Sequence, residues 1–295
     1  MIRSMTGYGE AERDSPAGRL RLEVKTVNHR FFNPSVKTPH GFDKHEAAIT
    51  EALKRHVQRG HVSVHLSIDR GTSGAESPYR PDLARARAYL EALEVLRHEF
   101  NVSGTVNLSM IAAEPSLLRG PDVDRAAGVE PELVEELVEA AAAQLVELRV
   151  AEGKRLEADF RDRLSVIGTL LDAVAARAPG RLNEQRDRLR EAVRELSGQV
   201  DVDEDRLARE IAYLAERWDI NEEIVRFRSH VELFGEALDA PDAEPVGKKL
   251  GFLVQEMNRE ANTIASKAND AEIAHAAMGL KEEIERIREQ VENVE

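Results

Sequence analysis

The strand signals of this 295-residue chain are confined to its first 70 residues, and every later apolar pattern has helical spacing. In residues 61–69 apolar and polar side chains alternate, which is typical of a strand with one buried face. The preceding segments predict strands at residues 2–14, 18–30 and 35–38 and a helix at residues 43–58. The predicted fold class is therefore α+β: a small N-terminal antiparallel β-sheet with a helix, followed by a long helical arm and a C-terminal helical domain.

The second predicted strand changes the parity of its apolar positions. The apolar residues occupy even-numbered positions up to Val24, but the next one, Val27, is at an odd-numbered position. An extra residue in a strand shifts the side chains that follow it to the other face, so the change predicts a β-bulge near residues 25–26. Such a bulge would re-aim residues 28–30 at the end of the strand.

A long helix is predicted from residue 131 to residue 178, with Glu and Arg opposite its apolar positions. Pro179 and Gly180 are expected to break it, because proline lacks a backbone donor and glycine disfavours a helix interior. The helical pattern resumes over residues 181–197. The two parts are therefore expected to form a helical hairpin or arm.

The remaining helix and loop boundaries are predicted from turn-forming residues and from places where the apolar residues of a helix change register. At Asp219 the apolar stripe restarts out of register, which predicts a break in the helix. Other helices are predicted at residues 82–100, 107–113, 204–218, 220–238, 247–272 and 281–295, with loops at 71–78, 120–128, 197–203 and 240–245. Three domains are expected, at residues 1–120, 121–200 and 201–295.

Composition excludes several kinds of site. The chain has no cysteine, so any metal must bind to oxygen and nitrogen ligands, and a Cys nucleophile is impossible. The first residues lack the apolar segment of a signal peptide, and no run approaches the roughly 18 apolar residues that a membrane span needs. We expect a cytoplasmic protein without a membrane partner.

Charge is distributed unevenly along the chain. The net charge of −14 disfavours a nucleic-acid partner, because phosphate backbones attract an excess of Lys and Arg. Residues 1–70, however, carry 12 Lys and Arg against 8 Asp and Glu, with six of the nine histidines. A basic N-terminal face on an acidic helical body would explain this asymmetry, and so would an acidic surface that serves only solubility.

The helix predicted at residues 247–272 has an unusual polar side. Its apolar residues recur at helical spacing, but the opposite side carries Asn, Ser and Thr. Each of these lowers helix propensity by roughly a few tenths of a kcal/mol relative to the usual surface residues. Such local conflicts concentrate at functional sites. Hydrogen bonds to a neighbouring helix in an oligomer are the alternative explanation.

Ionisable side chains occur at helical spacing in the same region. Glu256 and Glu260, four residues apart, place two carboxylates on one side of a helix, with their Cβ atoms about 6 Å apart. Glu223, Arg226 and His230 share a face of the helix before it. A divalent cation such as Mg²⁺ or Mn²⁺ suits oxygen and imidazole ligands. Carboxylate pairs are also common on solvated helices, and a single His on a polar face is often only solvated.

No P-loop, dinucleotide-binding fingerprint, zinc-protease motif or nucleophile elbow is present. Three sets of segments, taken in order along the chain, nevertheless resemble the YicC/YloC family of bacterial endoribonucleases. They are Met1-Ile-Arg-Ser-Met-Thr-Gly-Tyr-Gly9 with Val27-Asn-His-Arg-Phe31; Asp219-Ile-Asn-Glu-Glu223 with Arg226 and His230; and Gly247-Lys-Lys-Leu, Phe252, Gln255-Glu-Met-Asn-Arg-Glu-Ala-Asn-Thr263, Ser266-Lys267 and Arg288-Glu-Gln-Val-Glu-Asn-Val-Glu295. The last set is highly specific, whereas residues 71–200 add only helical character.

The resemblance implies an endoribonuclease that cleaves single-stranded regions of RNA, depends on a divalent metal cation and assembles as a homohexamer. Residues 1–120 would form an RNA platform and residues 201–295 the catalytic domain. The expected catalytic residues are His230, Glu256, Glu260, Arg259 and Lys267, and the expected metal ligands are Glu256, Glu260 and Glu223. The expected RNA-binding residues are Arg3, Asn28, His29, Arg30, Arg59, Lys248, Lys249 and Asn262.

Under this hypothesis a metal held by the two carboxylates polarises the phosphodiester, and His230 acts as general acid or base. Arg259 and Lys267 stabilise the charge that develops on phosphorus. Two alternatives stay open. The RNA 2′-hydroxyl could be the nucleophile without metal at the chemical step, or the protein could be a non-catalytic RNA-binding or scaffold oligomer.

Overall fold

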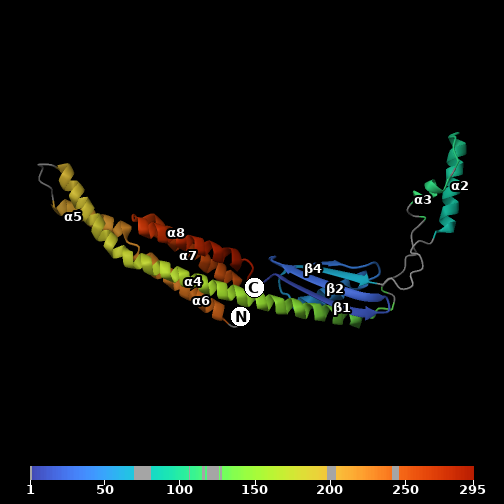
Figure 1. Cartoon of the computed structure of the whole chain (residues 1–295), viewed down its shortest axis with the longest axis horizontal. Coiled ribbons are helices and arrows are strands. Elements are labelled where there is room, and N and C mark those ends of the chain that lie inside the picture. Colours follow the sequence, from blue (N-terminus) through green and yellow to red (C-terminus); the bar gives the residue numbers. More distant parts are fainter. Residues whose placement is uncertain are drawn as a thin grey trace.

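The computed structural model describes residues 2–69, 81–105, 107–114, 117, 126, 128–197, 204–240 and 246–295. The molecule is elongated, and one long helix runs along both the sheet and the C-terminal helices (Figure 1). The strands are β1 (Gly7–Ser15), β2 (Gly18–Val27), β3 (Phe32–Lys37) and β4 (Gly60–Asp69). The helices are η1 (Asp43–His45), α1 (Glu46–Lys54), α2 (Leu83–Glu99), α3 (Leu108–Ala112), α4 (Pro131–Ser197), α5 (Glu204–Trp218), α6 (Asn221–Asp239), α7 (Gly247–Lys267) and α8 (Ala271–Val291).

The predicted α+β fold class is confirmed. The sheet has the order β1-β2-β4-β3, with antiparallel pairing from β1 through β2 to β4. The prediction of an antiparallel sheet is wrong at one edge, where β3 pairs with β4 in parallel. The reason is the crossover through η1 and α1, which returns the chain to the same end of the sheet before β4 begins.

The bulge predicted near residues 25–26 is wrong. Strand β2 pairs in unbroken register with both neighbours, and Thr26 continues the buried parity of Val24. Thr26 is only 2% exposed, whereas Val27 is 50% exposed and faces outward. A β-branched threonine fits an inward strand position, so the apolar pattern alone misplaced the face.

The inner face of the sheet packs on α1 and on the first part of α4. Gly9 permits the close approach of β1 to α4, because a Cβ atom there would lie 2.0 Å from the carbonyl oxygen of Ala141. The second core lies between α4, α6, α7 and α8. Helix α4 supplies buried residues to both cores, such as Leu145 to the first and Phe160 to the second. The division into three domains at residues 120 and 200 stays a prediction.

The hairpin predicted at Pro179-Gly180 is also wrong, because α4 is helical through both residues. Contacts on either side of Pro179 hold the helix together. The guanidinium of Arg177, before the proline, lies 2.8 Å from the carboxylate of Glu184, after it. Arg181, two residues after the proline, is buried. Tertiary contacts therefore outweigh the local cost of proline. The C-terminal part of α4 turns away from the axis of the rest (Figure 1).

The predicted boundary between the last two helices is displaced. Helix α7 ends at Lys267, Asn269 has a φ of 40°, and Asp270 caps α8 by accepting hydrogen bonds from the N–H groups of Glu272 and Ile273. Burial alone would raise the pKa of Asp270, but these N–H groups and the Arg177 guanidinium outweigh burial and hold it below its ordinary value. The apolar stripe continues across this turn and so hid it in the sequence.

The two ends of the chain meet between the sheet and the helical bundle (Figure 1). Ser4 pairs with Val294, and the backbones of Arg3 and Glu295 exchange two hydrogen bonds. The buried Arg149 of α4 donates to the carbonyl oxygen of Ser4 at 2.6 Å and forms an ion pair with Glu295. These contacts fix the sheet and the bundle on the same helix.

Helices α2 and α3 carry no buried residues and lie apart from the rest of the molecule (Figure 1). The loops predicted at residues 71–78, 120–128, 197–203 and 240–245 fall wholly or mainly outside the described residues. No described helix combines the length and the apolar character that a membrane crossing requires.

Candidate metal centre

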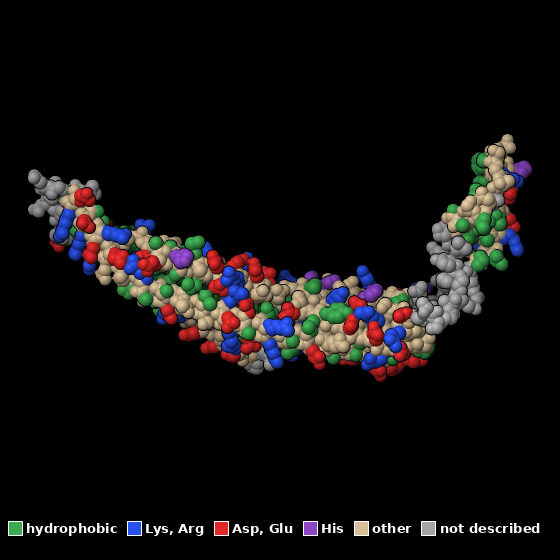
Figure 2. Space-filling view, in the orientation of Figure 1, with side chains coloured by type: hydrophobic (Ala, Val, Ile, Leu, Met, Phe, Trp, Pro, Cys, Tyr) green, Lys and Arg blue, Asp and Glu red, His purple; other side chains and the backbone are tan. Residues whose placement is uncertain are grey.

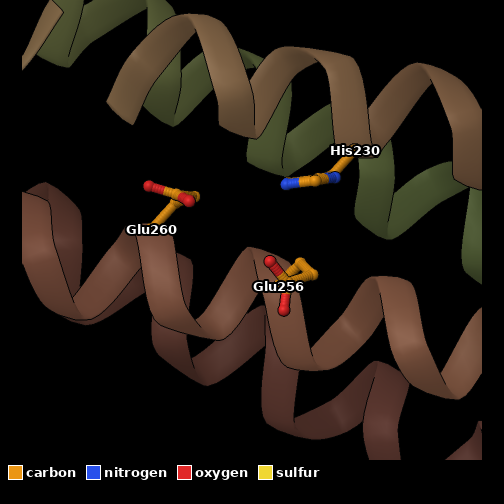
Figure 3. Close-up of side chains that lie close together, drawn as sticks. All are labelled: His230, Glu256 and Glu260. Atoms are coloured by element: carbon orange, nitrogen blue, oxygen red, sulfur yellow. The ribbon is translucent and has the colours of Figure 1, made fainter. Parts of the chain in front are cut away.

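Three side chains with metal-binding atoms meet between α6 and α7. His230 comes from α6, and Glu256 and Glu260 come from successive turns of α7. One ligand atom from each lies within 4.8 Å of the other two. Figure 3 shows the imidazole facing the two carboxylates across the space between the helices. The helical spacing predicted that the two carboxylates share a face, and the packing of α6 on α7 brings His230 to them.

The burial of this group favours a cation. Glu260 is only 4% exposed, and His230 and Glu256 are half-buried. The Nδ1 atom of His230 is buried and finds no hydrogen-bond partner among the described residues. Arg259 lies 3.7 Å from Glu256 but is largely exposed on the far side of that residue. Two carboxylates sharing a partly buried space repel each other, and a divalent cation would offset that cost.

The chemistry of the donors fits a hard or borderline divalent cation. Ligand atoms on opposite sides of such an ion are about 4 to 5 Å apart, twice the usual bond length. The ligand atoms of His230, Glu256 and Glu260 lie within 4.8 Å of one another, so no two of them are too far apart to bind the same ion. Two oxygen ligands and one imidazole suit Mn²⁺, and Mg²⁺ accepts the same carboxylates with water in the remaining positions.

Glu223, the third predicted metal ligand, lies outside the group. It is two helical turns before His230 on α6, about 10 Å along the helix axis. Its carboxylate instead accepts a hydrogen bond from Lys267 at 2.8 Å, and Lys267 also donates to the carbonyl oxygen of Asp219. The structure therefore brings Glu223 and Lys267 together, at one end of the α6 and α7 pair, and His230 to the other two glutamates.

The unusual polar residues of α7 have different surroundings. Thr263 donates to the carbonyl oxygen of Arg259, and Ser266 donates to that of Thr263. These two hydroxyls are thus satisfied within their own helix. Arg259 and Asn262 are exposed on α7, and Arg259 lies 3.7 Å from the carboxylate of Glu256. The predicted catalytic Arg259 therefore lies next to the group, at its solvent edge.

Part of the predicted RNA-binding set gathers at the junction of sheet and bundle. Asn28 donates to the carbonyl oxygen of Glu292 at 2.6 Å, and Arg59 donates to that of Val294 at 2.9 Å. Lys248 and Lys249 are exposed in the first turn of α7, directly after Gly247, which packs on Val294 and Arg59. Arg59 and Asn28 thus hold the end of the chain, while the two lysines face solvent.

The remaining predicted RNA-binding residues are exposed. The Arg30 guanidinium lies over the ring of Phe31 at 5.1 Å, and the Nδ1 atom of His29 is 2.9 Å from the Phe31 carbonyl oxygen. Arg3 is also exposed, next to its backbone pairing with Glu295. None of these positions is in the group formed by His230 and the two glutamates.

Two further residues, Phe252 and Arg181, are not among the predicted site residues. Phe252 is 58% exposed on the polar side of α7, one turn before Glu256, and this departure from the apolar stripe could have been noticed. Arg181 is 1% exposed and donates to the backbone at the ends of α5 and α7. Nothing in the pattern of α4 marks Arg181 as buried.

The fold and the group together define an α+β protein with a candidate divalent-cation centre between two antiparallel helices. Comparison with known families is more specific. The chain belongs to the YicC-like endoribonuclease family: the description "Endoribonuclease YicC-like, N-terminal region" matches residues 2–158, and "Endoribonuclease YicC-like, C-terminal" matches residues 174–295. The resemblance seen in the sequence motifs is thereby confirmed.

Two relatives match over their whole length. A protein of Clostridioides difficile strain 630 named "Probable endoribonuclease YicC" is 30% identical over 297 residues, which cover 100% of both chains. A protein of the same name from Haemophilus influenzae strain KW20 is 30% identical over 296 residues, again with 100% of both chains covered. The first family region ends and the second begins within α4, the helix that joins the two cores.

Proposed function

We propose that this chain is an endoribonuclease that cleaves single-stranded regions of RNA and depends on Mg²⁺ or Mn²⁺. The observation that carries the proposal is the group of His230, Glu256 and Glu260, whose ligand atoms lie within 4.8 Å of one another in a chain of this family. A role in RNA decay or regulation follows from such an activity.

Each residue in or near the group would have a separate role in cleavage. Glu256 and Glu260 would hold the cation, which when bound polarises a phosphodiester oxygen or a water molecule. In this assignment the two carboxylates are the protein ligands of the cation, and the imidazole of His230 beside them would take up or donate a proton. Arg259, at the solvent edge, attracts the RNA phosphate and balances the negative charge that increases during cleavage. Lys267, two turns away and paired with Glu223, would contact a neighbouring phosphate.

The RNA ends produced by cleavage test this assignment. Labelled single-stranded RNA is incubated with the purified protein with Mn²⁺, with Mg²⁺, and with EDTA. We expect cleavage only with a divalent cation and a 5′-phosphate on the downstream product. A 2′,3′-cyclic phosphate would instead show attack by the RNA 2′-hydroxyl and remove metal-activated water from the proposal. RNA that is bound under every condition and never cut would favour the non-catalytic scaffold.

We also propose that the chain assembles with copies of itself, as a hexamer. Helices α2 and α3 bury none of their residues, and Figure 2 shows apolar side chains gathered on them. An apolar patch of this kind on a protein surface marks an interaction site. The large exposed apolar residues on and between the two helices are Leu83, Val95, Leu96, Phe100, Val102, Leu108 and Met110.

Light scattering tests the assembly. We expect a mass six times the 32.9 kDa of one chain for the native protein, and a smaller assembly for Phe100→Glu, because the substitution places a charge in the apolar patch. Val225→Glu adds the same charge at an exposed apolar position of α6 and serves as the control. A native mass of 32.9 kDa would refute the assembly.

A further inference from the structure

An exposed aromatic residue lies one helical turn from the candidate metal centre. Phe252 is 58% exposed, four residues before Glu256 on α7, and therefore on the same face of the helix. Leu233 is 41% exposed, three residues after His230 on α6. Large apolar side chains usually turn toward the core, and the cores of α6 and α7 do contain their other phenylalanine and leucine residues.

Phe252 and Leu233 lie on the same side of the centre. Glu223 on α6 contacts Lys267 on α7. His230, later on α6, approaches Glu260, which is earlier on α7. The two helices are therefore antiparallel. Leu233 follows His230 on α6 and Phe252 precedes Glu256 on α7, so both are displaced from the centre in the same direction along the helix axes.

Cationic and polar side chains surround Phe252 on α7, whereas Glu232 and Glu236 are exposed beside Leu233 on α6. Lys248 and Lys249 are exposed one turn before Phe252. Gln255 and Arg259 are exposed one and two turns after Phe252. The opposite side of the centre is different, since Glu223 and Lys267 form an ion pair there. Phe252 and Leu233 are therefore on the side of the centre away from this ion pair.

We propose that Phe252, supported by Leu233, stacks on a nucleobase of single-stranded RNA next to the phosphate held at the centre. The inference rests on the proposed function and adds to it the position of one nucleotide. Lys248 and Lys249 would hold the phosphate that follows this base. An aromatic face combined with cations that follow the backbone is the arrangement that binds single strands without sequence preference.

The size of the feature favours a base over a protein partner. Phe252 lies among lysine, arginine and amide side chains of α7. One phenylalanine and one leucine form only a small apolar surface, whereas protein interfaces use larger contiguous patches. The positive charges beside it complement phosphate. A flat ring at the edge of a helix presents its face to one base, and stacking tolerates any base identity.

Binding of RNA without cleavage isolates this role. The affinity of the full-length protein for a 12-nucleotide oligouridine is measured by fluorescence anisotropy in EDTA, and repeated with one abasic nucleotide moved along the strand. We expect Phe252→Ala to weaken binding by about 5- to 150-fold, the range for loss of one stacked base. Phe252→Trp is expected to bind at least as tightly as the native protein. Tyr213→Ala, which removes another exposed ring on α5, is the matched control and should have no effect.

The abasic scan distinguishes stacking from a general loss of structure. At the position where an abasic nucleotide weakens binding of the native protein most, it should not weaken binding of Phe252→Ala further. Equal affinity of Phe252→Ala and the native protein would overturn the inference, and so would a change of assembly mass in light scattering, which would make Phe252 a subunit contact. Native protein that binds in this pattern but never cuts RNA would refute the proposed cleavage and leave the stacking role intact.

Discussion

Glu260→Gln is expected to lower the rate of single-stranded RNA cleavage by at least about 100-fold at saturating Mn²⁺. The substitution keeps the shape of a side chain that is 4% exposed but removes its negative charge, and the centre then holds His230 and Glu256 alone. A neutral amide is a poor ligand for a hard cation, so titration calorimetry should show weaker Mn²⁺ binding as well. The rate is measured as the first-order constant with enzyme in excess over labelled RNA.

A stability measurement separates the loss of a ligand from the loss of the fold. Without metal, the carboxylates of Glu256 and Glu260 repel each other, so Glu260→Gln should unfold in EDTA at a temperature equal to or above that of the native protein. Mn²⁺ should then raise the unfolding temperature of the native protein but not that of the variant, because only a ligand that binds the folded state stabilises it.

Glu285→Gln, at an exposed position of α8 that forms an ion pair with Arg288 one turn later, is the control for charge removal. It should change neither the cleavage rate nor the response to Mn²⁺. Native cleavage and native Mn²⁺ affinity in Glu260→Gln would remove this group from the active site.

The sequence predicted the carboxylate pair on α7 and the histidine on α6 as site residues, but not how the two helices pack together. Helical spacing alone places Glu256 and Glu260 on one face of α7. The position of His230 opposite them depends on the antiparallel packing of α6 on α7 and on its register, which the Glu223 and Lys267 pair helps to fix. Register between two helices arises from side-chain packing over many residues, and no local pattern encodes it. This is why Glu223 was expected in the centre and lies two turns away from it.

The incorrect boundaries have two causes. At Thr26 a polar residue took an inward strand position, and at Pro179 a helix breaker was retained inside a helix. At Asn269 and Asp270 a turn interrupts two helices whose apolar stripes run on. At Pro179 contacts of Arg181 with α5 and α7 outweigh a local preference of about 3 kcal/mol. At Thr26 and at Asn269-Asp270 the local residue types agree with the structure, but the apolar pattern does not show them. The apolar pattern of a single segment contains neither kind of information.

Arg181→Met is expected to destabilise the protein by about 3 to 5 kcal/mol, the usual cost of breaking a buried charged contact. Arg181 donates from Nη1 to the carbonyl oxygens of Lys267 and Ala268, at 3.1 and 2.5 Å, and from Nη2 to that of Trp218. Burial lowers the pKa of its guanidinium, with Asp270 and Asp219 acting in the opposite direction. Methionine fills a similar volume but leaves these carbonyl groups without donors.

The loss of stability should be large because the Arg181 guanidinium donates hydrogen bonds to the C-terminal ends of two helices. The last carbonyl groups of a helix lack partners within the helix and carry partial negative charge, so a buried cation satisfies both deficits for α5 and α7 at once. Urea unfolding followed by circular dichroism measures the change. Arg186→Met, five residues later on α4 and bound only to exposed Asp187, should stay within about 0.5 kcal/mol of the native protein. A loss below about 1 kcal/mol for Arg181→Met would show that water replaces the guanidinium at these helix ends, and Arg181 would then not be what joins α4 to the helix that carries Glu256 and Glu260.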